Sequence, residues 1–329
     1  MSNSVCAVVV TYNRKELLLE CLESLKTQTR PIQGIYLIDN ASTDKTPELL
    51  LEKAYISELP PQNLKEPWEK EFTIKNLTNM EDIKLHYVRM HENTGGASGF
   101  YEGVKRGYEK GYDWLWLMDD DGIPTETALE SLISKIKAFD RSKIGFLCSK
   151  VLWTDKTPHI MNIPAVKPLV NGIPFNFFEE KDVLLVESAS FVSLLIRREI
   201  VQAVGLPITE FFIWADDVEY TLRITKNGFF GLYVKDSIVI HKTKSNYSSS
   251  GVYDWKFYYN VRNWLWIYKL HYKNRYIYLL LKTILLTPKL PLKVWHVNIK
   301  ASIDSFIKKP KVDYCKEIDK YEHKSISRY

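Results

Sequence analysis

The chain has 329 residues, of which 45% are hydrophobic and 26% are charged. This composition is ordinary for a folded protein and excludes a low-complexity chain, and the length allows one large α/β domain with a smaller appended piece. The net charge of +5 is unevenly placed, because residues 251–329 hold 16 Lys and Arg against 6 Asp and Glu. That stretch carries +10, and the rest of the chain carries −5.

The cysteines and the N-terminus indicate the compartment. The four cysteines are widely spaced and form no CxxC motif, which is typical of a protein from a reducing environment. The N-terminus lacks the pattern of a signal peptide, and no apolar run is long enough to span a membrane. These features predict a cytoplasmic protein.

The first 140 residues alternate between apolar strands and amphipathic helices. We expect strands at 6–10, 35–38, 85–88 and 114–118. Helices are expected after Asn13, after Asp44 and over 98–108, and a further helix is expected to begin at the cap Thr125 and run to Phe139. Residues 54–80 are rich in Pro, Lys and Glu and fit an inserted surface loop or a short helix. The alternation predicts an α/β fold with a mostly parallel sheet flanked by helices.

The second half of the chain does not repeat this pattern. One or two strands are expected over 183–196, a helix over 214–226 that stops at Asn227-Gly228, and a strand over 229–240 that ends at His241. The tail from Val252 is helical in character and rich in aromatic residues. We therefore expect a catalytic-type α/β domain over residues 1–250 and a helical segment over residues 251–329.

Polar residues follow each of the four early strands. The strand ends are Thr11-Tyr12-Asn13, Asp39-Asn40, His91-Glu92-Asn93 and Asp119-Asp120-Asp121. Parallel sheets bind ligands at the carboxyl ends of their strands, so these groups are expected to line one crevice.

Asp119, Asp120 and Asp121 are the strongest chemical signal. Three carboxylates at the mouth of a buried strand repel one another, and a divalent cation removes this cost while holding a diphosphate. Asp119 and Asp121 point to the same side of an extended chain, which makes them the expected pair. The alternative is an acidic turn that caps the following helix.

Three further motifs are weaker when taken singly. Asn93-Thr94-Gly95-Gly96-Ala97-Ser98-Gly99 could let backbone N–H groups approach a phosphate, or could be a plain turn between strand and helix. Asp216 and Asp217 could supply a general base, or could be acidic residues favoured in the first turn of a helix. His241 could be a structural histidine or a third metal ligand.

Together these motifs resemble the inverting family 2 glycosyltransferases of GT-A fold. The resemblance covers roughly residues 5–265. The arrangement of Asn93-x-Gly95-Gly96, Met118-Asp119-Asp120-Asp121 and Trp214-Ala215-Asp216-Asp217-Val218-Glu219-Tyr220 is most similar to bacterial galactofuranosyltransferases, with rhamnosyltransferases next. One departure is the order Trp-Ala-Asp-Asp where the family has Trp-Asp-Asp, which bears on Trp214 as a sugar-stacking residue.

The resemblance implies a set of roles. Nucleotide-sugar binding would fall to Thr11, Tyr12, Arg14, Asp39, Asn93, Gly95, Gly96, Asp119, Asp120 and Trp214. A divalent metal, Mn or Mg, would be held by Asp119, Asp121 and His241. Asp217 would be the catalytic base, and the adjacent Asp216 is the alternative.

The resemblance also implies the reaction and the partners. The donor would be UDP-galactofuranose, with dTDP-rhamnose as the alternative, and the acceptor a hydroxyl of a glycan or lipid-linked glycan. A non-catalytic nucleotide-sugar-binding module is a further alternative. The basic, aromatic tail predicts peripheral contact with the cytoplasmic face of the inner membrane, or is simply a solvated helical face. Nucleic acid is not an expected partner, because the tail lacks a recognition motif and the body is acidic.

Overall fold

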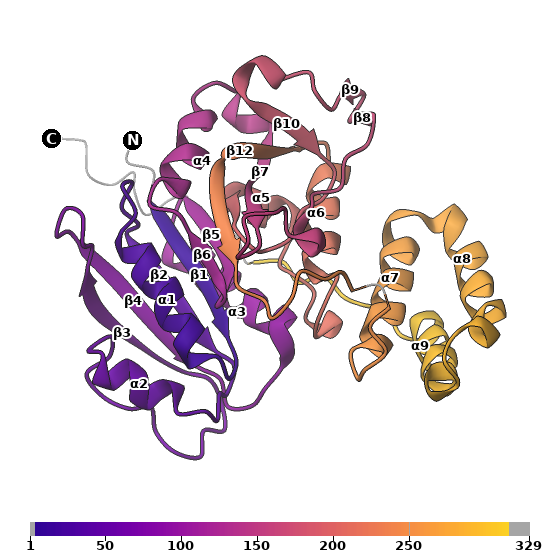
Figure 1. Cartoon of the computed structure of the whole chain (residues 1–329), viewed down its shortest axis with the longest axis horizontal. Helices are drawn as coiled ribbons and strands as arrows, with labels where there is room; N and C mark the ends of the chain where they lie inside the picture. Colours follow the sequence, from indigo (N-terminus) through magenta and orange to yellow (C-terminus); the bar gives the residue numbers. More distant parts are fainter. Residues whose placement is uncertain (1–3, 250, 316–329) are drawn as a thin grey trace, which may run out of the picture.

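The continuous apolar run near the N-terminus forms strand β1 (Val5–Thr11), which lies inside a ten-stranded sheet in a computed structural model (Figure 1). The structure describes residues 4–249 and 251–315. All seven residues of β1 are buried, because helices cover both faces of the sheet. Alternate side chains therefore enter two separate cores, with Val9 in one and Val8 in the other.

The strands that the sequence predicts for the first half pair in parallel. Their order is β5 (Trp114–Asp119), β1, β2 (Gly34–Asp39) and β4 (Asp82–Arg89). The intervening helices are α1 (Lys15–Lys26), α2 (Thr46–Glu52) and α3 (Gly95–Lys110). This arrangement confirms the predicted alternation and brings the carboxyl ends of these strands to one edge of the sheet.

Helix α3 packs unusually close to the sheet. A Cβ on Gly99 would lie 2.4 Å from Cγ1 of Val10, and a Cβ on Gly103 would lie 2.2 Å from Cγ1 of Val8. Such distances are far inside van der Waals contact, so only glycine fits at these two positions. Part of the glycine-rich sequence of α3 thus serves packing.

The second half of the sheet is mixed. Its strands are β7 (Ile144–Leu152), β10 (Val183–Val186), β11 (Leu194–Arg197), β12 (Phe230–His241) and β6 (Gly122–Pro124). Strand β12 runs parallel to β7, while β11 runs antiparallel to both of its neighbours, β5 and β7. Helices α5 (Arg198–Val204) and α6 (Asp216–Lys226) join α3 on one face, and α1 and α4 (Ala128–Ile136) cover the other. A small hairpin of β8 (Leu169–Val170) and β9 (Ile173–Pro174) lies outside the main sheet.

The prediction of a loop or short helix over residues 54–80 is wrong. The segment contains strand β3 (Trp68–Lys75), which pairs antiparallel with β4 at the edge of the sheet. Its exposed face carries Glu69, Glu71 and Lys75, which suit an edge strand because charged side chains discourage pairing with other chains.

The predicted cap at Thr125 is also wrong. Both the backbone N–H and the hydroxyl of Thr125 donate to the carbonyl of Ile238, so this residue continues the pairing of β6 with β12. Helix α4 begins at Ala128, and it ends at Ile136 rather than at Phe139.

The helical C-terminal segment stands beside the sheet (Figure 1). It consists of α7 (Phe257–His271), α8 (Lys273–Leu285) and α9 (Trp295–Ile307). Residues after α9 return to the body, where the carbonyl of Asp313 accepts from the N–H of Leu206 at 2.8 Å. None of the described helices combines the length and the apolar character needed to cross a bilayer. The predicted segment 251–329 extends beyond the described residues.

Candidate active site

A cavity of about 500 Å³ opens where the central strands end. Residues after β1, β4 and β5 form one side of it, and the loop before α6 together with the start of α7 forms the other. It collects almost all of the predicted site residues, namely Thr11, Tyr12, Arg14, Asn93, Gly95, Gly96, Asp119, Asp120, Asp121, Trp214, Asp216, Asp217 and His241. The predicted crevice at the strand ends therefore exists.

Asp119, Asp121 and His241 lie together in this cavity. One ligand atom from each falls within 4.8 Å of the other two, an arrangement that fits a divalent cation. The sheet sets this geometry, because β6 pairs antiparallel with β12 and places Gly122 opposite His241. Asp121 directly precedes Gly122, so its carboxylate reaches Nε2 of His241 at 3.0 Å.

The orientation of His241 is fixed by a second residue. Its Nδ1 lies 2.8 Å from Oδ1 of Asn162, an atom that can only accept, so Nδ1 carries a proton there. The amide of Asn162 donates in turn to Ser190 at 2.9 Å. This contact directs Nε2 of His241 toward the carboxylates, as outer partners of metal-binding histidines commonly do.

The middle aspartate has different partners. Asp120 accepts from the hydroxyl of Thr11 at 2.7 Å and from the guanidinium of Arg14 at 3.2 Å. Arg14 also pairs with Asp121. The expected pairing of Asp119 with Asp121, with Asp120 turned elsewhere, agrees with these contacts.

The surroundings oppose the charge of Asp119 and Asp120 but favour that of Asp121. Burial, with the charge of Asp121, raises the pKa of Asp119 to about 6, and burial raises the pKa of Asp120 to about 7. Burial acts on Asp121 too, but the hydrogen bond and charge of His241 outweigh it and lower the pKa of Asp121. Positive charge is therefore favoured at this point of the cavity.

The loop before α6 holds an unusual backbone. Phe212, Trp214 and Ala215 have φ values of 62°, 66° and 65°, in the left-handed region that costs energy for residues other than glycine. Asn263 of α7, which is fully buried, donates to the carbonyls of residues 211, 213 and 214 at 2.9, 3.0 and 2.8 Å. The helical segment thus fixes the loop that leads into Asp216 and Asp217.

Two family models match this chain. The model described as "Glycosyl transferase family 2" matches residues 6–62, and the one described as "Glycosyltransferase like family 2" matches residues 74–260. The second alone covers more than half of the chain. The chain belongs to the family 2 glycosyltransferases.

Curated relatives of this family 2 chain share a name. Galactofuranosyltransferase GlfT1 of Mycolicibacterium smegmatis is 28% identical over 231 residues, which are 68% of this chain and 66% of the relative. The protein of the same name from Mycobacterium tuberculosis is 25% identical over 251 residues, which are 75% of this chain and 72% of the relative. The chain thus spans about two thirds to three quarters of the length of these relatives.

Solved structures confirm the GT-A fold. GalNAc-T7 with UDP, GalNAc and Mn²⁺ superposes with a TM-score of 0.60 at 15% identity, covering 93% of this chain and 55% of that one. TarS 1-349 of S. aureus in complex with UDP gives a TM-score of 0.54 at 14% identity, covering 92% and 80%. At such identities the likeness establishes the fold alone.

Asp39 is the predicted site residue that the cavity does not include. Its side chain is fully buried and accepts from the hydroxyl of Tyr87 at 2.8 Å, from the guanidinium of Arg89 and from the N–H of Ser42. Asp39 is therefore not among the residues that line this cavity, and its contact with the nucleobase or ribose stays a prediction. Asn40, the next residue, lines the cavity in its place.

Asn40 ties two of the strand ends together. Its side chain donates to Asn93 at 3.0 Å and accepts from the N–H of Thr94 at 3.1 Å. Gly95 has a φ of +83°, and a Cβ there would lie 2.3 Å from the carbonyl of Phe212. A Cβ on Gly96 would have no neighbour within 4 Å, so the start of α3 leaves room for a ligand there.

The two adjacent aspartates of α6 differ in their surroundings. Asp216 is 7% exposed, and burial together with the charge of Asp217 raises its pKa well above the ordinary value. Asp217 is half-buried, and burial raises its pKa to about 6 while the N–H of Val218 opposes the rise at 2.7 Å. Asp217 is therefore the less buried of the two, and its carboxylate has a backbone N–H to stabilise its charge.

Sequence reasoning missed several residues that face the cavity. They are Asn162, Phe191, Tyr247, Lys256 and Asn260. Asn162 comes from a segment without helical or strand periodicity, so only the fold places it near His241. Nζ of Lys256 lies 5.2 Å from the centre of the Trp214 ring, a contact that no local sequence motif predicts.

Proposed function

We propose that this glycosyltransferase moves galactofuranose from UDP-galactofuranose to a hydroxyl of a glycan or lipid-linked glycan acceptor, with inversion at the anomeric carbon. The observation that carries the proposal is a cavity that holds both a metal-type cluster and an ionisable, half-buried carboxylate, Asp217. The sugar is suggested by the two relatives, which are named galactofuranosyltransferases.

The nucleotide would lie along the strand ends. Thr11, Tyr12 and Asn40 line that side of the cavity, and the open backbone at Gly96 allows close approach of the ribose or a phosphate. Arg14, now paired with carboxylates, is long enough to turn toward a diphosphate. Asp119, Asp121 and His241 would hold Mn²⁺ or Mg²⁺, which when bound offsets the negative charge on the departing diphosphate.

Asp217 would remove the proton from the acceptor hydroxyl. The acceptor oxygen then bonds to the anomeric carbon from the face opposite the diphosphate, the bond from that carbon to the phosphate oxygen breaks, and configuration inverts. Asp216 suits this role less, because its side chain is more deeply buried than that of Asp217 and burial raises its pKa well above the ordinary value. Trp214, on the same wall, would stack on the sugar.

Two variants test the base. Asp217→Asn should reduce transfer by roughly 10²–10⁴-fold, the contribution of general-base catalysis, while leaving the Kd for UDP within about twofold. Asp216→Asn should keep most of the activity, because the more deeply buried Asp216 does not serve as the base. The assay follows product formation from UDP-galactofuranose and a synthetic glycan acceptor, with dTDP-rhamnose as competing donor. Full activity of Asp217→Asn, or transfer from dTDP-rhamnose alone, would overturn the proposal.

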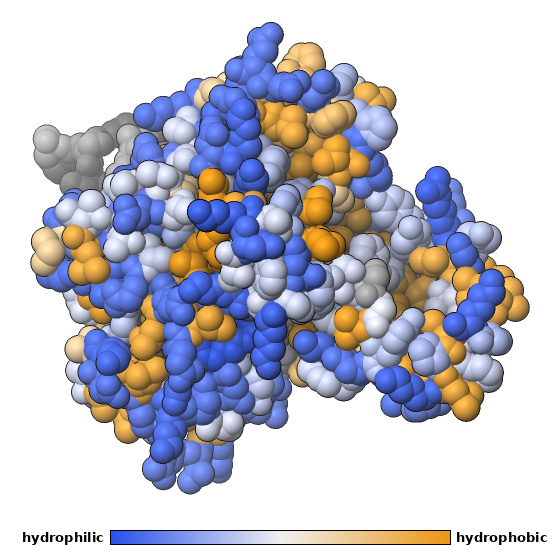
Figure 2. Space-filling model, viewed as in Figure 1, coloured by the Kyte–Doolittle hydropathy of each residue, from blue (hydrophilic) through white to orange (hydrophobic). Residues whose placement is uncertain are grey.

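The helical segment would contact a membrane surface. Ile277, Leu281 and Leu285 form one stripe on α8 with exposures of 51%, 54% and 77%, and apolar side chains gather on this part of the surface in Figure 2. The +10 charge of residues 251–329 suits anionic lipid, so the occupant we propose is the cytoplasmic face of the inner membrane.

Liposome co-sedimentation tests this contact. The wild-type protein should pellet with vesicles containing phosphatidylglycerol, and the double variant Leu281→Glu/Leu285→Glu should stay in the supernatant. Leu59→Glu, at an exposed leucine of the body, is the matched control. Equal pelleting of all three proteins would refute the assignment.

A further inference from the structure

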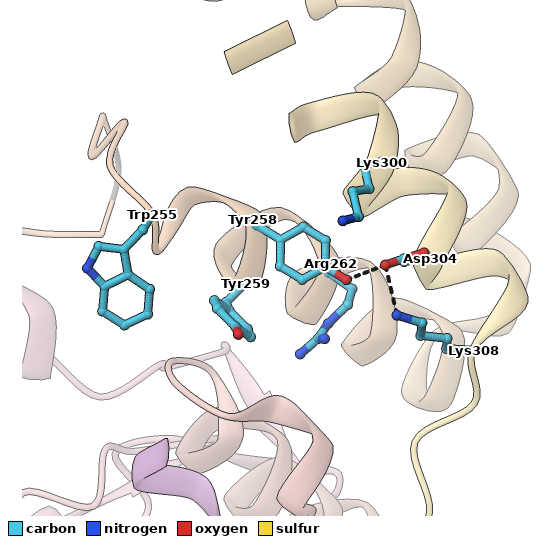
Figure 3. Close-up of a pocket in the computed structure, with 7 residues that line it drawn as sticks. All are labelled: Trp255, Tyr258, Tyr259, Arg262, Lys300, Asp304 and Lys308. Atoms are coloured by element: carbon cyan, nitrogen blue, oxygen red, sulfur yellow. Dashed lines mark hydrogen bonds and ion pairs between the residues drawn. The ribbon is translucent and has the colours of Figure 1, made fainter. Parts of the chain in front are cut away.

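A second hollow of about 520 Å³ lies between α7 and α9, beside the active-site cavity (Figure 3). Its walls are Trp255, Tyr258, Tyr259, Arg262, Lys300, Asp304 and Lys308. Trp255 also lines the active-site cavity, so the two spaces share a wall at that residue. The volume is in the range of small-molecule sites.

Aromatic rings connect the two spaces. Phe212, in the loop before α6, stacks on Tyr259 with ring centroids 4.9 Å apart, and Trp255 meets Tyr259 edge-on at 6.0 Å. Tyr258 continues the row on the other side of Tyr259 at 5.2 Å. Trp255 is 59% exposed, an unusual exposure for so large a ring. Flat, partly exposed aromatic faces offer apolar contact to the C–H faces of sugar rings.

The far side of the hollow is cationic. Arg262, Lys300 and Lys308 face it, and Asp304 is the carboxylate among its lining residues. Asp304 already accepts from the hydroxyl of Tyr258 and from Nζ of Lys308 at 2.9 Å. Lys300 lies 5.9 Å from the centre of the Tyr258 ring. Three cations against one carboxylate leave an excess of positive charge, which favours an anionic ligand.

Arg262 gives this side a fixed charge. It is 6% exposed and donates to the carbonyl of Glu210 at 2.6 Å and to that of Phe211 at 3.2 Å. The same guanidinium lies 5.0 Å from the centre of the Tyr259 ring. Arg262 therefore contacts the chain just before the active-site loop and also forms the base of the hollow.

We propose that this hollow is a distal acceptor subsite for a phosphate-bearing glycan. The sugar ring lies on Trp255 and Tyr259, and the phosphate or pyrophosphate binds Lys300 and Lys308. The acceptor thus extends from the hydroxyl at Asp217, across the aromatic row, to an anionic end between α7 and α9. This inference rests on the proposed glycosyl transfer to a glycan, which it deepens by naming the charge that the acceptor carries.

Binding measurements test the subsite without turnover. The probes are two water-soluble disaccharides that differ only in a phosphate at the reducing end, titrated calorimetrically into the full chain. The double variant Lys300→Ala/Lys308→Ala should weaken binding of the phosphorylated probe by about 10-fold or more and leave the neutral probe unchanged. Trp255→Ala should weaken both probes. Lys289→Ala, at an exposed lysine outside both cavities, is the matched control and should change neither.

Further measurements distinguish an acceptor phosphate from a lipid headgroup, and the subsite from the proposed glycosyl transfer. Inorganic pyrophosphate should compete with the phosphorylated probe, whereas phosphatidylglycerol vesicles should not if the site serves the acceptor. Equal affinity of wild-type protein for both disaccharides, or an equal loss in Lys289→Ala, would overturn the subsite. Failure of transfer from UDP-galactofuranose with unchanged probe binding would instead count against the proposed function alone.

Discussion

Asn263→Ala should separate positioning of the catalytic loop from general stability. The amide of Asn263 donates to three carbonyls, of which that of Phe211 would keep Arg262 as a donor. The carbonyls of residues 213 and 214 would lose this donor, at a cost of about 1–3 kcal/mol each. Relaxation of the loop will recover part of this cost, so we expect the free energy of unfolding to fall by about 2–4 kcal/mol. The left-handed residues Phe212, Trp214 and Ala215 would also be free to relax, at about 1–2 kcal/mol of stored strain each.

The catalytic consequence follows from that relaxation. A shift of about 1 Å in a reacting group can cost roughly 100-fold in rate, so kcat should fall by one to two orders of magnitude. The Kd for UDP should hold, since the predicted nucleotide contacts lie on the strand ends rather than on this loop.

Asn298→Ala provides the matched control. Asn298 is an equally buried amide on α9 that donates to the carbonyl of Thr283 and the hydroxyl of Thr287 at 3.0 and 2.8 Å. Its loss should destabilise the helical segment without changing kcat. Denaturant unfolding and steady-state kinetics on both variants decide the matter. If Asn263→Ala unfolds more easily yet keeps the wild-type kcat, the catalytic position of the loop does not depend on the hydrogen bonds of Asn263.

Four other predictions concern the site and the core. Asn162→Ala should weaken Mn²⁺ binding by about 10–100-fold in calorimetry, because His241 loses the partner that orients it; unchanged affinity would contradict that role. Since Asp217 acts ionised and its pKa is raised to about 6, kcat/KM should rise tenfold per pH unit below 6 and level off above it; a flat profile down to pH 5 would contradict this. The raised pKa also means that ionised Asp217 costs stability above pH 6, so Asp217→Asn should be at least as stable as wild type at pH 8. Gly103→Ala should lower stability by about 1–3 kcal/mol in denaturant unfolding, since its Cβ would meet Val8 at 2.2 Å; a stabilised variant would refute this.

The parts of the fold that the sequence predicted correctly are those with local periodicity. The unbroken apolar run of β1 can only be a strand buried on both faces, and that alone implies helices on each side. Strand β3 (Trp68–Lys75) was missed because half of its residues are charged and it lies in a segment rich in Pro and Lys. What makes this segment a strand is pairing with β4, a non-local interaction that its own sequence does not reveal.

Some residues of the candidate site could likewise be predicted from local sequence, and others could not. The cluster of Asp119, Asp121 and His241 could be predicted because Asp119 and His241 end apolar strands and Asp121 lies two residues after Asp119. Asn162 and Asn263 could not, because their roles depend on which atoms the fold brings to their amides. Asp39 is the opposite case. It ends a strand as predicted, but its buried carboxylate binds Arg89 and Tyr87 and does not line the cavity.

The choice between Asp216 and Asp217 shows why a site needs the fold for its chemistry. The two residues are identical in type and adjacent in sequence, so no pattern distinguishes an acid from a base. The first turn of α6 buries Asp216 and leaves Asp217 half-buried, with the N–H of Val218 to stabilise its charge. Burial raises both pKa values, that of Asp216 well above its ordinary value and that of Asp217 to about 6. Asp217 is therefore ionised at pH 7, as a general base must be, and it differs from its neighbour only in the surroundings that the fold supplies.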